Sequence, residues 1–452
     1  MKKLIYILFT ILFVFLFLRC TELENWDEET NTIPPGTISN PNVENLHGGA
    51  RITYTLPSDD DLLGVKAVYS FSEDGDSFES FSSAYRDTIE LNGFPDTRKR
   101  TVKLISIDKS SNESEPVEVE IQPLTPPVEL IRQSFSVKET FGGLFATWEN
   151  NTKTDIGISL YASDSTGILN FDYSHYTNAE AGSYSFRGFD DKERKFRLEI
   201  SDKWGNRATV DTILQPLFEE FIDARDEAGS VLWRRYGKED GSNQWRGDRM
   251  GNFREWLNFE KVFDEDLNGE SGIWVTPLPG NVLIDYTGKA EDAGAHMLPI
   301  YFTLDLGRSC KLSRHKHYHR AKFVLAGNGI REYEIWATNE TPKQPDDFTD
   351  IMESLAYWTE WPEVGGTDSW KNDWVKIADC VFAGPVSGST VSSGITAEDR
   401  QVANAEGFEF EIDPEYSTTP FRYLRFVQPQ GTWSGGTLHD IGELQFWGQS
   451  MQ

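Results

Sequence analysis

The sequence predicts an all-β protein built from tandem β-sandwich domains. Three observations predict this fold class: an internal repeat of about 90 residues, short runs in which apolar and polar residues alternate, and an aromatic-rich composition. The chain of 452 residues holds 14 Trp, 16 Tyr and 29 Phe, but only five Met and three Cys. Aromatic side chains favour the pleated faces of sheets. At about 100–200 residues per domain, the length predicts two to four domains.

The repeat is carried by short features that recur at an offset of 92 or 94 residues. The recurring pairs are Pro34-Pro35 with Pro126-Pro127, Gly48-Gly49 with Gly142-Gly143, and Asp108-Lys109-x-x-Asn112 with Asp202-Lys203-x-x-Asn206. The prolines predict linkers, since proline cannot continue a strand ladder. The Asp-Lys-x-x-Asn steps predict turns, because Asp and Asn side chains bond to nearby backbone groups.

Alternating runs flank these features and predict strands with one buried face. In both copies one run follows the glycine pair and another precedes the Asp-Lys step: residues 50–57 and 101–107, then 144–150 and 195–201. Residues 34–124 and 125–217 are therefore expected to be two β-sandwich modules. Their length suits seven short strands, as in immunoglobulin-like or fibronectin-like domains. Neither holds a cluster of catalytic residue types, so a spacer role is expected for both.

The N-terminus indicates export. Lys2 and Lys3 precede an apolar stretch from Ile5 to Leu18, which has the length of a signal peptide. Cys20 follows directly, and the segment resembles a bacterial lipoprotein signal, which implies that Cys20 is lipidated and becomes the mature N-terminus. Arg19 stands where such signals usually have a small residue, so an uncleaved signal anchor is the alternative. Either way, we expect the protein to be held to a membrane.

The segment 21–33 is acidic and lacks periodicity, so it is expected to be a solvated tether. It resembles the signal that sends lipoproteins to the cell surface in some glycan-foraging Gram-negative bacteria, which implies an outer-membrane location. The whole chain has a net charge of −30. A field of this sign repels phosphate backbones and anionic headgroups, which argues against a nucleic-acid partner.

The third domain, residues 218–452, holds 11 of the 14 tryptophans. Four predicted strands follow one another in it: residues 301–307, 331–339, 421–427 and 441–448. In this order they resemble the discoidin or coagulation-factor type C family, also called galactose-binding-like. The resemblance implies a discoidin-like jelly-roll β-sandwich with binding loops at one end.

The full layout resembles accessory glycan-binding lipoproteins of polysaccharide-utilisation systems. Residues 57–69 and 115–127 also resemble the N-terminal domain of such lipoproteins. The resemblance implies a protein that captures polysaccharide or oligosaccharide at the cell surface and works beside the outer-membrane glycan uptake machinery.

Calcium is the cofactor that the discoidin resemblance implies. Relatives bind a structural Ca²⁺ through an acidic loop and a late glutamate, which correspond here to Asp264 and Asp266 and to Glu443. Carboxylate and carbonyl oxygens are the ligands that Ca²⁺ requires. An acidic loop satisfied by turn hydrogen bonds and water is the alternative.

Exposed aromatic rings beside polar side chains are the chemistry that grips a sugar, because Trp and Tyr offer an apolar face with a polar handle. The candidate ligand-binding residues are those in predicted loops: Trp245, Arg320, Trp370, Trp374 and Trp433. A packed position at the rim of the core is the alternative for each tryptophan. Trp274, Trp336 and Trp447 lie in or beside predicted strands and are expected in the core.

Two further groups leave alternatives open. His315, His317 and His319 alternate and would share one face of a strand, where they would either hold Zn²⁺ or form a partly buried sheet face. Cys310 and Cys380 can pair in an oxidising compartment only if their Cα atoms lie close enough.

The sequence lacks the motifs of common enzyme classes. It has no nucleophile elbow, HExxH helix or phosphate-binding glycine loop. A glycosidase needs two carboxylates across one bond, a pair that the acidic composition alone neither identifies nor excludes. We therefore expect a binding protein and no enzyme, and a protein-binding adhesion or scaffold component of an outer-membrane complex is the alternative.

Overall fold

The computed structural model describes residues 32–72, 75–236, 259–267, 274–275, 298–320, 324–325, 329–433 and 440–451. Cys20, the predicted tether up to Asn31 and Trp245 therefore lie outside the described residues. No helix among the described residues is long and apolar enough to cross a membrane.

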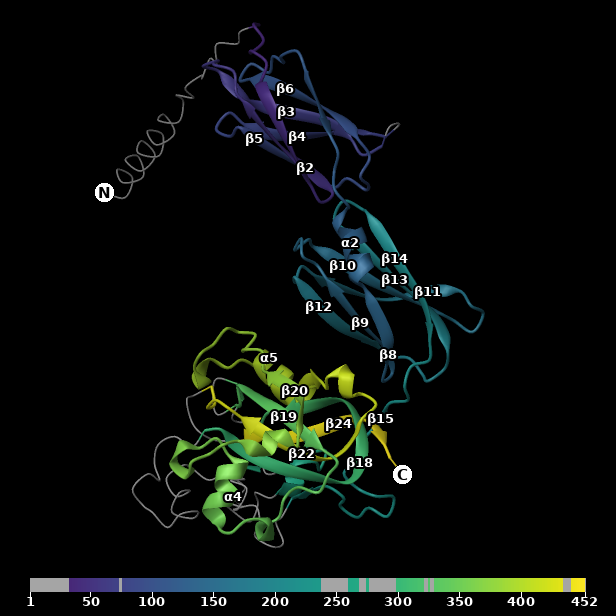
Figure 1. The fold of residues 1–452 in the computed structure, drawn as a ribbon, viewed down its shortest axis with the longest axis vertical. Coiled ribbons are helices and arrows are strands. Elements are labelled where there is room, and N and C mark those ends of the chain that lie inside the picture. The colour runs from purple at the N-terminus through teal and green to yellow at the C-terminus, as the bar shows by residue number, and fades with distance from the viewer. Residues whose placement is uncertain are drawn as a thin grey trace, which may run out of the picture. The chain divides into compact units, whose positions relative to one another are not determined.

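The first module is built from two antiparallel sheets (Figure 1). The three-stranded sheet has the order β1-β2-β5 and the four-stranded sheet the order β4-β3-β6-β7. The strands are β1 (Ser39–Leu46), β2 (Gly49–Thr55), β3 (Leu62–Ser70), β4 (Ser77–Ser83), β5 (Thr88–Asn92), β6 (Arg100–Asp108) and β7 (Val117–Ile121). Alternate residues of β2, β3 and β6, such as Ile52, Val65 and Leu104, are fully buried and form its core.

The second module follows a short helix, α2 (Pro127–Ser134), and again has a three-stranded and a four-stranded sheet. The sheet orders are β12-β9-β8 and β11-β10-β13-β14. The strands are β8 (Ser136–Thr140), β9 (Gly143–Glu149), β10 (Ile156–Ser163), β11 (Leu169–Thr177), β12 (Ala181–Arg187), β13 (Arg194–Asp202) and β14 (Arg207–Leu214).

The predicted Asp-Asn turns are confirmed in both modules. Asp108 accepts hydrogen bonds from the backbone N–H and the side-chain amide of Asn112, each at 2.8 Å. Asp202 accepts the same two bonds from Asn206, at 3.0 and 2.9 Å. Each aspartate thus satisfies the donors of the turn that leaves β6 or β13, which is why the motif recurs with the repeat.

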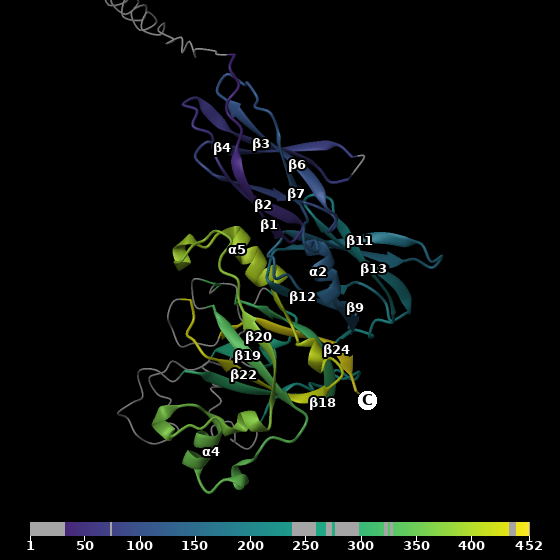
Figure 2. The same cartoon turned by 45° about the horizontal axis from the view of Figure 1, so that its top comes forward.

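The C-terminal domain is organised by one long strand, β18 (Ile300–Tyr318), in an eight-stranded sheet (Figure 2). The path of the sheet is β15-β24-β18-β22-β19-β20, with β16 and β21 also paired to β18. The first half of β18 pairs with β22, and the second half of β18 pairs with β24 and β21. The other strands are β15 (Glu220–Phe221), β16 (Arg234–Arg235), β19 (Glu332–Thr338), β20 (Val375–Val381), β21 (Phe408–Glu411), β22 (Pro420–Gln428) and β24 (Glu443–Ser450), and a separate pair is β17 (Trp274–Val275) with β23 (Asp440–Ile441).

Short helices connect these strands. The α-helices are α4 (Ile351–Trp358) and α5 (Ala397–Arg400), and Gln401–Glu406 continues α5 as a wider π-helical turn. Asp350 caps α4 by accepting hydrogen bonds from the backbone N–H groups of Met352 and Glu353. This capping satisfies donors that the first helical turn leaves free.

By internal contacts the chain forms two compact units, and their boundary runs through the second module. One unit comprises residues 1–136, 147–183 and 196–212, and the other comprises 137–146, 184–195 and 213–452. The second unit therefore joins one end of the β12-β9-β8 sheet to the C-terminal domain.

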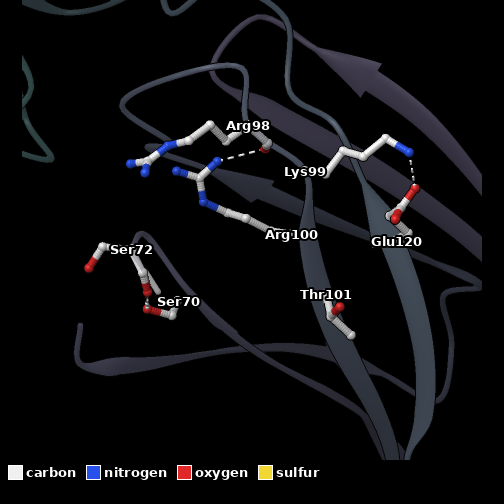
Figure 3. A pocket seen from close by; sticks show the side chains of 7 residues that line it. All are labelled: Ser70, Ser72, Arg98, Lys99, Arg100, Thr101 and Glu120. Atoms are coloured by element: carbon white, nitrogen blue, oxygen red, sulfur yellow. Dashed lines mark hydrogen bonds and ion pairs between the residues drawn. The ribbon is translucent and has the colours of Figure 1, made fainter. Parts of the chain in front are cut away.

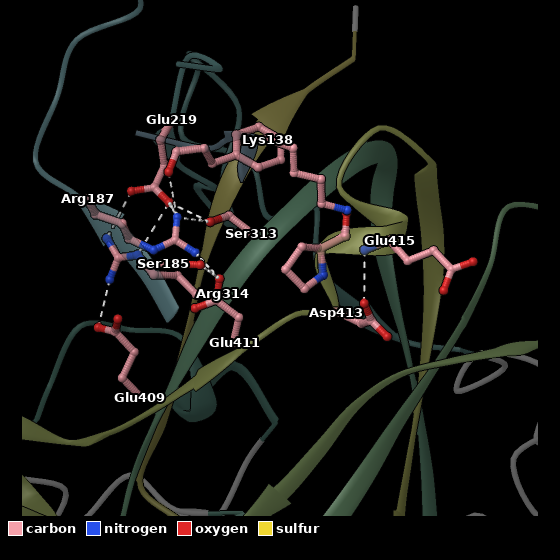
Figure 4. Close-up of polar contacts among 12 residues, drawn as sticks. Lys138, Ser185, Arg187, Glu219, Ser313, Arg314, Glu409, Glu411, Asp413 and Glu415 are labelled. Atoms are coloured by element: carbon pink, nitrogen blue, oxygen red, sulfur yellow. Dashed lines mark hydrogen bonds and ion pairs between the residues drawn. The ribbon is translucent and has the colours of Figure 1, made fainter. Parts of the chain in front are cut away.

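An ion-pair cluster inside this second unit is centred on Arg187 and Arg314 (Figure 4). Arg187 donates to Glu219 at 3.1 Å, to Glu411 at 2.6 Å and to the Ser313 hydroxyl at 2.8 Å. Arg314 also donates to Glu219, at 3.2 Å. Both guanidinium groups are only 16% exposed, so the contacts are screened far less than ordinary surface pairs.

Candidate ligand-binding site

The candidate site lies where several strands of the C-terminal domain end. β18 begins there at Ile300, which pairs with Gln428 at the end of β22, and β19 begins beside the end of β20 through the pair Glu332 and Val381. Connections between strands at one end of a sandwich are where binding residues usually gather.

Trp433 is the aromatic residue of this end. It follows β22, and its backbone N–H donates to the Gly329 carbonyl at 3.0 Å, which ties two connections together. A Cβ atom at Gly384 would lie 3.6 Å from the far edge of the indole, so the ring also reaches the segment after β20. The segment at Gly329 thus fixes the backbone of Trp433, and the segment at Gly384 lies against its ring.

Arg331 completes the site. Its guanidinium carbon lies 5.4 Å from the centroid of the Trp433 ring, and the backbone carbonyl of Arg331 accepts from the Phe382 N–H at 3.0 Å. Arg331 is exposed while Trp433 is half-buried. The arrangement offers an apolar ring edge next to a planar fork of hydrogen-bond donors, which together suit a ligand with apolar and hydroxyl-bearing faces.

Arg331 was missed as a site residue from sequence, although it opens the strand predicted at 331–339. Nothing in its local pattern distinguishes it from other charged residues at strand ends. Arg331 becomes a candidate only because Trp433, about 100 residues later in the chain, packs beside it. A contact between residues so far apart in sequence cannot be predicted from the local pattern.

Arg320 is half-buried at the end of β18. It follows His319, whose backbone N–H donates to the Ala403 carbonyl at 2.9 Å. This places Arg320 beside the π-helical turn, and its role in binding stays a prediction. Trp245, the remaining candidate, lies outside the described residues.

The prediction that Trp370 and Trp374 are exposed platforms is wrong, because these rings are only 0% and 5% exposed. Trp370 covers Arg425, a fully buried residue of β22 whose guanidinium lies 4.9 Å from the Trp370 centroid. The same guanidinium lies 4.6 Å from the Tyr301 ring and 5.0 Å from the Trp358 ring. A desolvated cation gains from aromatic faces around it, which is why the polar-looking segment folds its rings inward.

The three predicted calcium ligands come from two segments that are in contact: the turn at residues 264–266 and the start of β24. The Glu443 carboxylate is 1% exposed and accepts from the backbone N–H of Glu265 at 3.2 Å, in the turn that also holds Asp264 and Asp266. Its second oxygen is buried and has no hydrogen-bond partner among the described residues. Burial, reinforced by the charge of Asp264, raises the pKa of Glu443 to about 9.

A buried, unpartnered carboxylate oxygen beside a second carboxylate fits a cation. However, Asp264 is paired with Lys261 at 2.8 Å, and no group of three or more ligating side chains occurs among the described residues. Residues 268–273 of the acidic loop lie outside them. Calcium therefore stays a prediction.

His315 and His317 share one face of β18, His319 directly follows the strand, and all three imidazoles are buried in the core. The His315 Nε2 lies 2.6 Å from the Tyr333 hydroxyl, and the His319 Nδ1 accepts from the Leu325 N–H at 3.2 Å. Burial lowers the pKa of both imidazoles to about 3, so both are neutral. Packing against aromatic rings such as Phe382 makes them core residues.

Cys310 and Cys380 are both buried and both free. Cys310 lies in β18, where its cross-strand neighbours are Phe421 and Ser450. Cys380 lies in β20, and its neighbour is Tyr333 of β19. The two thiols therefore do not form a disulfide in this structure. Burial raises the pKa of Cys310 to about 11, which keeps that thiol protonated and unreactive.

A surface hollow of about 330 Å³ in the first module is basic in composition (Figure 3). Arg98 and Arg100 both pair with Asp96, at 2.7 and 2.8 Å, and Lys99 pairs with Glu120 at 2.6 Å. Hydrogen bonds from the two arginines and the Arg98 backbone outweigh burial and lower the pKa of Asp96 to about 2. Each cation of this hollow thus has an acidic partner, although Arg98 and Arg100 share the single carboxylate of Asp96.

Three family models match parts of the chain. Residues 35–123, 124–225 and 282–448 match models described as domains of unknown function, DUF4959, DUF5126 and DUF5000 respectively. No curated protein matches the chain.

Several solved structures are similar to parts of the chain. SusE-like protein BT2857 is 20% identical over 72% of this chain and 100% of its own, with a TM-score of 0.40. A two-domain fibronectin type III segment of chicken tenascin is 12% identical over 40% of this chain and 99% of its own, with a TM-score of 0.20. A family 32 carbohydrate-binding module from Clostridium perfringens, solved with galactose, is 14% identical over 43% of this chain and 87% of its own, with a TM-score of 0.24.

These are likenesses of fold. The structure itself is all-β, with antiparallel sheets arranged as tandem sandwiches, and the predicted fold class is confirmed.

Proposed function

We propose that this protein is a non-catalytic, lipid-anchored lipoprotein of the outer membrane that binds polysaccharide through its C-terminal domain and assists glycan uptake. The pairing of Trp433 with Arg331 carries the proposal. Galactose is a ligand of the Clostridium module named above, and a sugar of this kind needs both an apolar surface and hydrogen-bond donors. Trp433 and Arg331 supply both at the end of a sandwich.

The anchor and the location rest on the sequence. Lys2, Lys3 and the apolar stretch before Cys20 form an export signal, and the lipid on Cys20 would hold the acidic tether at the cell surface. In this arrangement the glycan uptake machinery of the same membrane is the partner that receives the captured glycan.

Structural calcium belongs to the same proposal. Glu443, Asp264 and Asp266 are the residues that would hold it, and the unpartnered oxygen of Glu443 is the observation that supports it. The ion would neutralise a buried carboxylate and so stiffen the acidic turn against the terminal strand.

Affinity electrophoresis of the mature chain through gels that contain single soluble polysaccharides tests the proposal. We expect one polysaccharide class to retard the protein, and Trp433→Ala or Arg331→Ala to reduce the retardation about tenfold, since each removes one half of the contact. Tyr85→Ala is the control, because Tyr85 is 97% exposed but belongs to the first module.

Retardation that stays at full strength in both C-terminal variants would remove Trp433 and Arg331 as the binding site. A folded protein that no polysaccharide retards would contradict glycan capture itself. Pull-down of membrane proteins would then test the scaffold alternative.

A further inference from the structure

The second module exposes aromatic rings on a sheet face where a spacer would have no need of them. In β10 the residues Ile156, Ile158, Leu160 and Ala162 point into the core, so Gly157, Ser159 and Tyr161 lie on the outer face. The register of β11 places Tyr176, Ser174 and Phe171 beside these three in that order. Tyr176 and Phe171 are 78% and 59% exposed.

Tyr176 forms a supported platform. It pairs with Gly157 across the strands, and a Cβ atom at residue 157 would come within 2.9 Å of the tyrosine ring. The missing side chain therefore lets the ring lie against the backbone of Gly157. The ring is held from one side and open to solvent on the other.

Polar groups surround this platform in a hollow of about 440 Å³. Ser201 pairs with Gly157 from the opposite side in β13, and its hydroxyl lies 3.4 Å from the Gly157 carbonyl. The Asn178 amide is oriented by Asp155 at 3.2 Å, and Lys203 also lines the hollow. Donors and acceptors thus stand around an exposed aromatic face.

A second aromatic pair lies further along the same face. Tyr161 and Phe171 are cross-strand partners with ring centroids 5.8 Å apart. Tyr161 is four residues from Gly157, which at about 3.3 Å per residue places it roughly 13 Å from the first platform. The hydroxyls of Ser159 and Ser174, 2.7 Å apart, lie between the two platforms.

The character of this face identifies its ligand. Rings separated by hydroxyl groups do not form the continuous apolar patch that marks many protein interfaces. The neighbouring charges are paired, Arg197 with Asp211 at 2.7 Å and Arg207 with Glu199 at 2.8 Å, so no net positive charge favours a membrane surface. An uncharged chain of sugar rings, with alternating apolar faces and hydroxyl edges, is the ligand that matches the strip.

We infer that the outer face of β10 and β11 is a second glycan-binding surface, at which Tyr176 and the Tyr161–Phe171 pair stack on separate sugar rings of one chain. The inference rests on the proposed function, because it assumes that a polysaccharide reaches the protein. It changes the role of the second module from a spacer to a contributor to avidity, since two linked sites bind a polymer more tightly than either alone.

The test uses the mature chain and the polysaccharide that retards it in affinity electrophoresis. We expect Tyr176→Ala and Tyr161→Ala each to weaken retardation about three- to tenfold, and Tyr176→Trp to restore it. Tyr85→Ala is the control, because Tyr85 is 97% exposed but belongs to the first module, away from this strip. In the Trp433→Ala background, we expect residual retardation that Tyr176→Ala abolishes.

The outcomes separate this inference from the proposed function. Retardation that depends on Trp433 but is unchanged by Tyr176→Ala and Tyr161→Ala, with both variants folded by circular dichroism, would overturn the second surface alone. Absence of retardation for the unmodified protein on every polysaccharide would overturn both. Retardation that depends on Tyr176 and is insensitive to Trp433→Ala would uphold the second surface and relocate the main site.

Discussion

A single buried carboxyl, Glu443, links the terminal strand of the C-terminal domain to the acidic turn at residues 264–266. It accepts one backbone hydrogen bond, from Glu265, and its other oxygen is buried without a partner among the described residues. Burial penalises the charged form, and the nearby Asp264 adds to the penalty, so the pKa of Glu443 is about 9 in the absence of a cation. Burying Glu443 therefore lowers the free energy of unfolding at neutral pH unless a cation lies beside its carboxyl group.

The pH dependence follows from the sign of this shift. Because the folded-state pKa lies above the unfolded one, the stabilising contribution is complete at low pH and is lost as pH rises from about 4.5 to about 9. With chelator present, Glu443→Gln should remove this loss, on the order of 3 kcal/mol at pH 7. Urea unfolding between pH 5 and pH 8 measures it. Added Ca²⁺ should stabilise the unmodified protein but not the Gln variant.

The matched control for this experiment is Glu340→Gln, because Glu340 is exposed in the same domain. Equal stabilisation by Ca²⁺ in Glu443→Gln and in the unmodified protein would place the ion elsewhere. No stabilisation in either would contradict calcium binding.

Single residues show what sequence can and cannot predict. The Asp108 and Asp202 turns were predictable because the partners lie four residues away and the hydrogen bonds are local. The burial of Trp370 and Trp374 was not predictable, because Trp370 packs on Arg425, 55 residues further along the chain, and Trp374 packs on Trp370. A buried guanidinium in a predicted strand looks, in sequence, like any outward-facing charge.

At the scale of elements, strands with strict alternation were predicted well. The predicted runs at 101–107, 195–201 and 421–427 correspond to β6 (Arg100–Asp108), β13 (Arg194–Asp202) and β22 (Pro420–Gln428). The 19-residue length of β18 was not predictable, because its second half reads as the polar, histidine-rich segment 313–319. That half is nevertheless buried, since β24 and β21 pair with it on its two sides.

The join between β12 and the C-terminal domain is a second element-scale feature. Arg187 bonds Glu219, Glu411 and Ser313 while mostly buried, so its loss takes the cation from Glu411 and leaves Glu219 with Arg314 alone. We expect Arg187→Met to lower the free energy of unfolding by about 2–3 kcal/mol, as measured by chemical denaturation. Arg197→Met, which breaks the solvent-exposed pair with Asp211, should cause a much smaller change. Equal effects would show that the Arg187 cluster behaves as a surface contact.

At the scale of the whole molecule, the chain joins a predicted export signal to two repeated sandwiches and a C-terminal all-β domain. The described residues with large exposed aromatic rings are concentrated in the two modules, including Tyr85, Phe171 and Tyr176, while the tryptophan-rich C-terminal domain buries most of its described indoles. Tryptophan count therefore predicted the C-terminal domain as the main binding domain without predicting which rings are available. Among the described tryptophans proposed as ligand-binding residues of the C-terminal domain, only Trp433 is partly exposed. The exposed rings of the second module make that module a second candidate for glycan binding.

The most direct test of glycan capture at the end of the C-terminal domain is calorimetric titration of the mature chain. The titrant is an oligosaccharide derived from the polysaccharide that retards the protein in affinity electrophoresis. The account predicts saturable heat and an affinity that Trp433→Ala and Arg331→Ala each weaken about tenfold, while Tyr85→Ala leaves the affinity unchanged. Full affinity in both Trp433→Ala and Arg331→Ala would contradict the central claim.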